Sequence, residues 1–417
     1  MEFVFVSNYI NHHQIPFCNA MYSALGGDFV FIQTEPMEEE RIRMGWQEEN
    51  RLPYVKYSYE EPEACRSLIM ESRGVLFGGT DDESHILPRL QAGRPVLRYS
   101  ERLYKTGQWK AVTPRGLLKK YRDHTRYRRA QVYLLCSGAY VPSDFHIVRA
   151  YPDKMYRWGY FPKTRHYDLD SLMAGKGYRL RPDMPRNPYI LWAGRFIDWK
   201  HPLLPVRTAA WLKSRGCSFH MDIIGGGEME KEVQGLIEQL DVGDCVTLQG
   251  FRTPEEVRSF MEKADIYLVT SDRQEGWGAV VNEAMNSGCA VVADHMIGAV
   301  PYLIRPGQNG RIYRDGDEEM LFRLVEELCR DTDMCRRLGR AAYDTITHTW
   351  NPENAAACLL ELCCRLGILD RKQYSSVNTG RDSADPSGRS ITPYGPCSKA
   401  PVVSEQKMYQ YLTQKLL

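Results

Sequence analysis

The sequence predicts an α/β protein with two doubly wound parallel sheets, and three observations support this fold class. Its 417 residues exceed what one ordinary hydrophobic core holds, so two domains are expected. Short β-branched runs alternate with longer helix-like stretches, as in a parallel sheet covered on both faces. A proline-rich passage, Tyr178–Pro188, interrupts this alternation, which then restarts. We therefore expect two Rossmann-like domains that face a cleft, with ligands at the carboxyl ends of the strands.

Five strand-like runs predict an N-terminal, acceptor-binding domain over residues 1–185. Each run is short and rich in β-branched or aromatic residues, as buried strands are. In chain order they are Phe3–Val6, Phe29–Gln33, Gly74–Phe77, Val96–Arg98 and Val132–Cys136.

Six further runs predict a C-terminal domain over residues 186–348, with helices between the strands. They are Tyr189–Trp192, Phe219–Ile224, Cys245–Leu248, Ile266–Thr270, Ala290–Ala293 and Gly310–Tyr313. The amphipathic run Glu353–Leu366 then predicts a helix within residues 349–370. Residues 371–417 are expected to form a flexible linker, rich in Ser, Gly, Pro and Asp, and a short terminal helix at Ser404–Leu417.

Composition narrows the class of protein. The chain has 54 Lys and Arg against 53 Asp and Glu, so its overall charge gives no reason to expect nucleic-acid binding. No stretch reaches the roughly 20 apolar residues of a membrane span, and the first residues lack the pattern of a signal peptide. The twelve cysteines are scattered without zinc-type spacing, which favours reduced thiols in a cytosolic protein and no metal site.

The stretch Ser271–Asn286 carries most of the chemical information. It leads from an apolar strand-like run into the helix-like run Ala279–Ser287, with Glu275 before the turn and Glu283 inside the helix. The start of a helix offers unpaired N–H groups and a positive dipole end, which suit phosphate or sugar hydroxyls. The two carboxylates can accept hydrogen bonds from a bound sugar and from a ribose. The alternative is an ordinary strand–helix connection with two solvated acids.

Two cations and a glycine run come earlier in the same domain. Arg195 and Lys200 follow a predicted strand, and their charges suit a diphosphate leaving group. Two surface cations at a helix start are the alternative. The run Gly225–Gly227 permits close backbone approach to a ligand, but a tight turn alone would explain it equally well.

These motifs occur in a fixed order along the chain. The order is Gly194-Arg195-Phe196 with Lys200, then Gly225-Gly226-Gly227-Glu228, then Leu248–Phe251, then Glu275-Gly276-Trp277-Gly278 with Glu283. Together they resemble the nucleotide-sugar-binding domain of the GT-B retaining glycosyltransferases, in particular the large family 4 of bacterial sugar transferases. The resemblance covers Tyr189–Asn354, and its specific part is the pair of glutamates with their flanking residues.

The resemblance implies a role for each of these residues. Glu283 would accept hydrogen bonds from the donor ribose, and Glu275 would lie beside the donor hexose. Arg195 and Lys200 would hold the diphosphate as the catalytic cations. The remaining donor contacts would come from Gly194, Gly226, Phe251, Gly276, Trp277 and Gly278, with Phe251 bordering the base.

The resemblance also implies the course of the reaction. The donor would be a UDP- or GDP-sugar, used without a cofactor or a metal, and the anomeric configuration would be retained. In the front-face mechanism of this family the leaving phosphate assists deprotonation of the acceptor, so no protein nucleophile is expected. The final helix of such a GT-B fold crosses back to the first domain.

Three departures from the family pattern lie near the reacting centre. Tyr302 stands where family members often carry an acid, so this donor contact has no matching side chain. No glycine follows the first strand, and His13 or His12 is the candidate to orient the acceptor or the sugar phosphate; a histidine packed under the loop is the alternative. Glu101 is a candidate acceptor-side group, where the family often has a histidine.

Residues 102–129 form a basic segment with ten Lys and Arg, one acid, and interleaved Leu, Tyr and Trp. Such a segment suits an anionic membrane surface, to which each nearby cation contributes about 1 kcal/mol. Docking there would serve an acceptor carried on a lipid diphosphate. A solvated helix face is one alternative, and RNA binding is another, although no known stacking module is present.

The sequence therefore predicts a cytoplasmic glycosyltransferase, peripheral on the inner face of the membrane if it docks there. It would transfer a sugar from a nucleotide donor to a saccharide or lipid-linked saccharide in cell-surface polysaccharide synthesis. Two alternatives stay open, a nucleotide-sugar epimerase of the same fold and a non-catalytic partner subunit.

Overall fold

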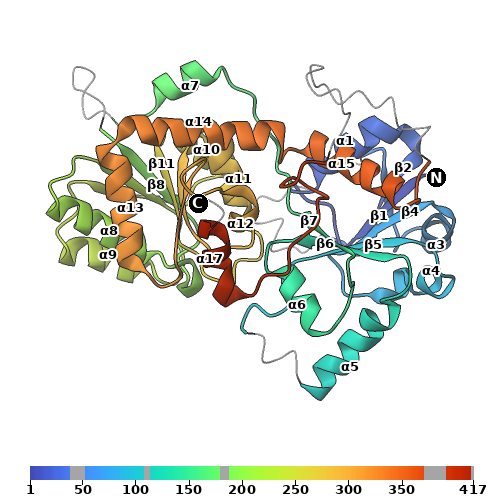
Figure 1. Ribbon diagram of the computed structural model, residues 1–417. Coiled ribbons are helices and arrows are strands. Elements are labelled where there is room, and N and C mark those ends of the chain that lie inside the picture. The colour runs from blue at the N-terminus through green and yellow to red at the C-terminus, as the bar shows by residue number, and fades with distance from the viewer. Residues whose placement is uncertain (38–51, 108–112, 179–186, 371–390, 415–417) are drawn as a thin grey trace. The chain divides into compact units, whose positions relative to one another are not determined.

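The computed structural model describes residues 1–37, 52–107, 113–178, 187–370 and 391–414, and it divides the chain into two compact units (Figure 1). Unit 1 comprises Met1–Lys163 and Thr349–Ser404. Unit 2 comprises Thr164–His348 and Glu405–Leu417. Each unit is built on its own parallel sheet, which is the predicted α/β class.

The sheet of unit 1 has seven parallel strands in the order β3-β2-β1-β4-β5-β6-β7. The strands are β1 (Phe3–Ser7), β2 (Phe29–Gln33), β3 (Val55–Tyr57), β4 (Gly74–Phe77), β5 (Val96–Ser100), β6 (Val132–Ser137) and β7 (Met155–Trp158). All five predicted runs form strands, and the two that were missed, β3 and β7, are the edges. An edge strand has one neighbour, so it can be short, as β3 is, or carry a charged residue, as β7 does with Arg157.

Helices flank this sheet, and one of them comes from the far end of the chain. They are α1 (Ile15–Leu25), α3 (Pro62–Glu71), α4 (Leu87–Gln91), α5 (Pro114–Asp123), α6 (Val141–Ile147) and α15 (Pro352–Arg365). Helix α15 packs against α1, and Trp350 just before it stacks on Phe161 with ring centres 6.0 Å apart. The predicted return of the late helix to the first domain is confirmed.

The sheet of unit 2 has six parallel strands in the order β10-β9-β8-β11-β12-β13. They are β8 (Tyr189–Ala193), β9 (His220–Ile224), β10 (Val246–Gly250), β11 (Ile266–Val269), β12 (Ala290–Asp294) and β13 (Arg311–Tyr313), and each was predicted. The order reverses between β8 and β11. In open sheets of this kind, ligands bind outside the carboxyl ends of the strands at such a reversal.

Helices cover both faces of the second sheet. They are α7 (Leu169–Gly175), α8 (Leu203–Ser214), α9 (Glu230–Gln239), α10 (Pro254–Lys263), α11 (Ala279–Asn286), α12 (Val300–Leu303), α13 (Glu318–Arg330), α14 (Thr332–His348) and α17 (Glu405–Gln414). Helices α8, α9 and α13 pack together over one face, and α10, α11 and α14 pack over the other.

The first boundary between the units lies between Lys163 and Thr164, earlier than the predicted boundary after residue 185. The intervening residues are bound to unit 2. Lys176, which is 2% exposed, donates to the carbonyl oxygen of Ala264 at 2.6 Å at the end of α10, and Arg165 pairs with Glu262 at 2.9 Å. The proline-rich passage therefore interrupts a unit that has already begun; residues 179–186 themselves lie outside the described part.

The segment after α15 differs from the flexible linker predicted for it, as far as it is described. Residues 371–390 lie outside the described part, but the next residues pack along β7. The N–H of Arg157 donates to the carbonyl of Ser398 at 2.8 Å, and the N–H of Cys397 donates to the carbonyl of Arg157 at 2.8 Å. The free edge of β7 offers these backbone groups, so a Ser- and Pro-rich segment becomes ordered against it. The predicted terminal helix is present as α17.

Candidate functional site

The unit 2 residues singled out in the sequence lie after the carboxyl ends of neighbouring strands. Arg195 follows β8, Gly226 follows β9, Phe251 follows β10, and Glu275 follows β11. Because these strands are parallel and adjacent, their connections meet at one edge of the sheet, beside the reversal in strand order. The candidate site is built there.

Lys200 and Glu275 form an ion pair across this edge. Lys200 ends the short 3-10 turn Asp198–Lys200, and its Nζ donates to Oε2 of Glu275. The two side chains are 18% and 15% exposed, so the pair is partly desolvated. The hydroxyl of Thr270, at the end of β11, donates to the carbonyl oxygen of Lys200 at 2.6 Å and fixes the turn. The sequence named both residues but did not predict that they bind each other.

An aromatic ring lies beside both predicted cations. The Nζ of Lys200 is 4.7 Å from the ring centre of Trp199, and the guanidinium carbon of Arg195 is 5.9 Å from it. Arg195 is exposed, whereas Lys200 is half-buried. Trp199 thus keeps two cations together at the carboxyl end of β8. Its position in the sequence between them was the only signal for this arrangement.

The connection into α11 presents backbone and buries its aromatic side chain. Gly278 has φ +88°, and a Cβ there would lie 2.8 Å from Cγ2 of Ile297, so glycine is needed. Trp277 is 1% exposed, and its Nε1 donates to Oδ1 of Asn282 at 2.9 Å. Its ring neighbours Tyr302, the residue at the acid position of the family, with centres 6.4 Å apart. Both aromatic residues belong to the core, so only the backbone of Trp277 can contact a ligand.

Glu283 lies in the second turn of α11 and is half-buried. Burial raises the pKa of its carboxyl group, while the nearby guanidinium groups of Arg258 and Arg165 act in the opposite direction. Arg258 is itself 6% exposed and donates to Oδ1 of Asn286, one turn further along α11. The carboxylate therefore sits in a partly desolvated place where two arginines stabilise its charged form.

The glycine run after β9 is explained by the packing of two loops. The N–H of Phe196 donates to the carbonyl of Gly226 at 2.9 Å. A Cβ on Gly225 would lie 1.9 Å from the carbonyl oxygen of Gly194, and one on Gly227 would lie 2.6 Å from that of Phe196. At Gly226 the nearest atom would be 3.5 Å away, so this middle glycine is uncrowded. The outer two glycines of the run serve close backbone approach between two loops, which differs from both explanations left open, approach to a ligand and a tight turn.

Phe251 is the exposed apolar residue of this edge. Its side chain is 75% exposed, directly after Gly250, whose φ of +65° ends β10. A large exposed aromatic ring at a strand end has no packing role of its own and offers a stacking surface. This suits the position beside a base that the resemblance implied.

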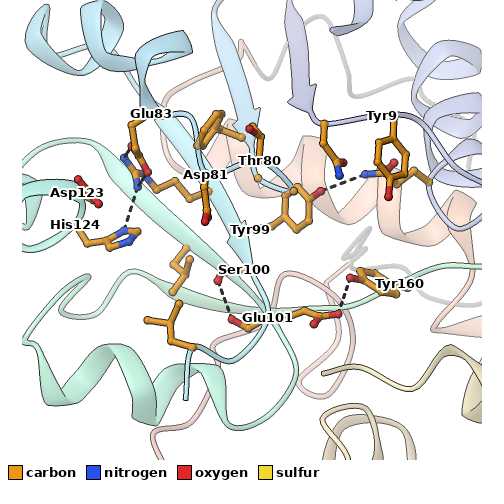
Figure 2. A pocket seen from close by; sticks show the side chains of 18 of the residues that line it. Tyr9, Thr80, Asp81, Glu83, Tyr99, Ser100, Glu101, Asp123, His124 and Tyr160 are labelled. Carbon is orange, nitrogen blue, oxygen red and sulfur yellow. Dashed lines mark hydrogen bonds and ion pairs between the residues drawn. The ribbon is translucent and has the colours of Figure 1, made fainter. Parts of the chain in front are cut away.

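Unit 1 carries a separate pocket of about 430 Å³ at the carboxyl ends of its own strands (Figure 2). Figure 2 shows Glu83 and His124 on one side, Glu101 and Tyr160 on the other, and Tyr99 between them. His13 also lines the pocket, and the other lining residues are Asn8, Tyr9, Asn11, Gln14, Phe77, Gly78, Gly79, Thr80, Asp81, Arg98, Ser100, Leu103, Lys119, Lys120, Asp123 and Leu134.

Two hydrogen-bond networks shape this pocket. The hydroxyl of Tyr99 is 3.0 Å from that of Ser7 and accepts from Nε2 of Gln14 at 3.2 Å. On the other side, Arg98 is 3% exposed and its Nη2 pairs with Glu83 at 2.5 Å. Sequence reasoning missed these residues, although Arg98 and Tyr99 stand only three and two positions before Glu101. Polar residues at the end of a buried strand were the available signal.

His13 lies in unit 1 and lines this pocket. Its ring stacks on that of Tyr160 with ring centres 5.8 Å apart, and the ring centre of His12 is 3.9 Å from that of His13. Burial, and then the charge of His12, lower the pKa of His13 to about 3. The imidazole is therefore neutral at physiological pH and can orient a hydroxyl, but it supplies no positive charge.

Glu101 faces the same pocket. It accepts from the hydroxyl of Tyr160 at 2.6 Å and pairs with Lys105 at 2.8 Å. The acceptor-side candidates Glu101 and His13 are thus joined through one ring, that of Tyr160, in a single wall of the pocket.

The family comparison matches the part of the chain that holds the unit 2 site. Residues 182–345 match the family described as glycosyl transferases group 1. Over these residues, the chain is similar to the group 1 glycosyl transferases. The matched region contains Lys200, Glu275 and Glu283, together with the whole second sheet.

Curated relatives are similar over the same region. The amylovoran biosynthesis glycosyltransferase AmsK of Erwinia amylovora is 30% identical over 193 residues, which is 45% of this chain and 47% of AmsK. The lipopolysaccharide core biosynthesis glycosyltransferase LpsE of Rhizobium meliloti is 25% identical over 185 residues, 44% of this chain and 52% of LpsE. The chain therefore spans about half the length of the curated relatives it matches.

Solved structures are similar over both units. Anabaena Alr3699/HepE, solved with UDP and glucose, has a TM-score of 0.58 at 14% identity and covers 87% of this chain and 98% of that one. The lipopolysaccharide outer core galactosyltransferase WaaB has a TM-score of 0.59 at 14% identity, covering 85% and 99%. At such identities the likeness establishes the fold alone, which is the GT-B fold of two Rossmann-like domains.

Three expectations about composition can be compared with the structure. The twelve cysteines, all in described positions, are free thiols as predicted. Over the described ranges, no helix is both long and apolar enough to cross a membrane. In the same ranges, no group of three or more His, Cys, Asp and Glu side chains is arranged to hold a metal ion.

Proposed function

We propose that the protein is a retaining glycosyltransferase that transfers a sugar from a nucleoside-diphosphate donor to a saccharide acceptor in cell-surface polysaccharide synthesis. The observation that carries this proposal is the meeting of Arg195, Lys200, Glu275 and Glu283 at one strand edge of the matched region. The names of AmsK and LpsE, which refer to amylovoran and to the lipopolysaccharide core, support the polysaccharide context.

The donor diphosphate is assigned to the two cations beside Trp199. Negative charge grows on the leaving diphosphate as the glycosidic bond breaks, and preorganised cations stabilise that charge more in the transition state than in the ground state. Lys200 is held in place by Glu275, while Arg195 is exposed and free to adjust to the ligand. Glu275 then contacts the donor sugar as well as orienting Lys200.

The nucleoside is assigned to Glu283 and Phe251. Glu283 is a partly desolvated carboxylate, and ribose hydroxyls are the donors that such an acceptor binds best. The exposed ring of Phe251 borders the base. UDP is the first nucleotide to test, since UDP occupies the solved relative HepE, and GDP is the second.

The acceptor is assigned to the pocket of unit 1. Its volume of about 430 Å³ falls in the range of ligand pockets, and amide, hydroxyl and carboxylate groups converge in it, as sugar recognition requires. The acceptor hydroxyl attacks the anomeric carbon on the face that the diphosphate leaves, and a phosphate oxygen takes its proton. The reaction so proposed uses no metal, no cofactor and no protein nucleophile.

A membrane-linked acceptor is supported by the surface of α5. This helix exposes Leu117, Leu118 and Tyr121 at 43%, 70% and 59%, and Arg115, Lys119 and Arg122 are exposed beside them. Apolar side chains among cations suit the anionic inner face of a membrane. Residues 108–112 of the predicted basic segment lie outside the described part.

The membrane part is tested by sedimentation with phosphatidylglycerol vesicles at low and high salt. Leu118→Ser should reduce binding, and Leu87→Ser, which changes a leucine of α4 that is 37% exposed, is the matched control. Binding that is equal for both variants and insensitive to salt would remove the membrane surface from the proposal.

The donor part is tested by calorimetric titration of UDP and of GDP. One nucleotide should bind the wild-type protein, and Glu283→Ala should abolish that binding, whereas Glu238→Ala, on the exposed face of α9, should not. Incubation with the matching nucleotide sugar then separates the alternatives. Epimerised donor without acceptor would favour an epimerase, and binding without any turnover would favour a non-catalytic subunit.

A further inference from the structure

The chain ends in a helix that returns to unit 2. Residues 391–400 lie along β7 in unit 1, but α17 (Glu405–Gln414) belongs to unit 2 (Figure 1). Neither the crossing-back helix α15 nor the family match, which ends at residue 345, accounts for this segment. Its place in unit 2 therefore needs an explanation of its own.

Helix α17 is docked through one apolar face. Met408 and Leu412, one turn apart, are 1% and 9% exposed. Between them, the ring of Tyr409 meets His295 edge-on, with centres 5.5 Å apart, and its hydroxyl donates to the sulfur of Met320 at 3.4 Å. The opposite face, with Gln406 and Gln410, is exposed. This is the pattern of a packed amphipathic helix.

The docking position is beside the strand ends that form the donor site. His295 directly follows β12, and its N–H donates to the carbonyl of Tyr313 at 3.1 Å. Arg273 lies in the connection after β11, two positions before Glu275, and its Nη1 is 3.9 Å from Oε2 of Glu405. Helix α17 thus contacts the connection after β11, which carries Glu275, and the connection after the neighbouring strand β12.

The connection after β11 is held from its other side by the turn after β8. The N–H of Asp272 donates to the carbonyl of Trp199 at 3.0 Å, and His201 pairs with the Asp272 carboxylate at 3.6 Å. Together with the Lys200–Glu275 pair, these contacts leave the connection supported on one side by residues 199–201 and on the other by Glu405.

We propose that α17 is a positioning element of the donor site, which holds the connection Ser271–Gly278 in the conformation that presents Glu275. Tyr409 and Glu405 are its positioning residues. They touch no substrate, and they act through His295 and Arg273. The effect on the donor rests on the proposed function, but the effect on the connection itself does not. A preformed connection loses less conformational entropy when the donor binds, so α17 lowers the KM for the donor more than it changes kcat.

Hydrogen exchange tests the structural half of this proposal in the full-length protein. Met408→Asp places a charge in the buried face of α17 and should release the helix, and Tyr409→Ala should loosen it. Both variants should speed amide exchange at residues 271–278 and at His295, while Gln410→Ala on the exposed face should leave it unchanged. Unchanged exchange at residues 271–278 in Met408→Asp, with α17 released, would overturn the proposal whatever the protein binds.

Kinetics and a charge exchange test the functional half. Tyr409→Ala should raise the donor KM about fivefold, the size expected for one lost aromatic contact, with kcat nearly unchanged. Glu405→Arg and Arg273→Glu should each raise KM about threefold, and the double variant should restore the wild-type value. If the donor KM of the double variant is raised as much as in the single variants, the Glu405–Arg273 ion pair does not link α17 to the connection after β11.

The two proposals fail in distinguishable ways. If the wild-type protein binds neither UDP nor GDP while exchange at residues 271–278 still depends on Met408, the donor assignment is wrong and α17 still positions the connection. If nucleotide binds and the variants change neither exchange nor KM, the donor assignment stands and α17 has no positioning role.

Discussion

At the scale of single residues, the structure changes how the two best candidates act. Lys200 and Glu275 were read from the sequence as a phosphate ligand and a sugar ligand, and they are in direct contact. Residues in contact have coupled effects on activity, because removing one partner leaves the other without its orientation. The pair therefore has to be tested as a pair.

Lys200→Met should lower kcat about 100-fold, the usual size for loss of one group that stabilises developing charge. Glu275→Gln should lower kcat to a similar degree, because Lys200 loses its orienting partner. The double variant should be little worse than either single one, measured as kcat and KM with a saturating acceptor. Lys231→Met on the exposed side of α9 is the control. Multiplicative losses would show that the two residues act independently.

His13 makes a prediction about pH. Its folded pKa is lowered from 6.5 to about 3, so the unfolded chain takes up a proton at a pH where the folded protein does not. The stabilisation is therefore complete above about pH 6.5 and is lost as the pH falls toward 3. When the pH is lowered from about 7 to about 4.5, the unfolding free energy of the wild type should fall by about 2 kcal/mol more than that of His13→Gln.

Urea unfolding at the two pH values measures this difference. His146→Gln changes an exposed histidine of the same unit and should behave like the wild type. If the unfolding free energies of the wild type and His13→Gln fall by the same amount, the imidazole is protonated in the folded protein at the lower pH. It is then available as a cation in the unit 1 pocket.

At the scale of elements, the glycine run after β9 gives a prediction with an internal control. Gly227→Ala places a Cβ 2.6 Å from the backbone oxygen of Phe196 at a φ of +152°, and neither group can move without shifting a strand end. It should destabilise unit 2 by about 2 kcal/mol or more. Gly226→Ala meets nothing closer than 3.5 Å and should cost about 1 kcal/mol or less.

The check is urea unfolding of both variants, with nucleotide titration alongside. If Gly226→Ala abolishes nucleotide binding without loss of stability, the uncrowded middle glycine is the one that approaches the ligand. If the stability losses are equal, the packing explanation of the run is wrong.

The elements themselves were predictable to different degrees. Central strands such as β8 and β12 are continuous apolar runs because both faces are buried, and the sequence identified all of them. Edge strand β7, with Arg157 inside it, lacks that pattern. Residues 391–399 pack against this edge through hydrogen bonds. The composition of that segment gives no sign of these bonds, because they depend on a strand far away in the sequence.

At the scale of the whole molecule, the motifs that resemble a known family and the candidate donor residues lie in the same unit, unit 2. Motif spacing predicted that the candidate donor residues gather at one edge of the second sheet, because strand–turn–helix connections are local in sequence. The unit 1 pocket gathers Tyr99, Glu83, His124 and Tyr160 from distant segments, and no short motif joins them. His13 and Glu101 were candidates from the sequence, but these four residues became visible only through the fold.

This separation into two units predicts separate responses to ligand. Each unit has its own sheet and core, so calorimetric unfolding should show two transitions rather than one. A nucleotide that binds unit 2 should stabilise that unit by about 2.7 kcal/mol at 100 times its Kd, and raise its Tm by about 8 °C. Gly227→Ala identifies the transition of unit 2 by lowering it, and the unit 1 transition should shift in neither case. A nucleotide that raises the other transition instead would move the donor site to the pocket around Tyr99.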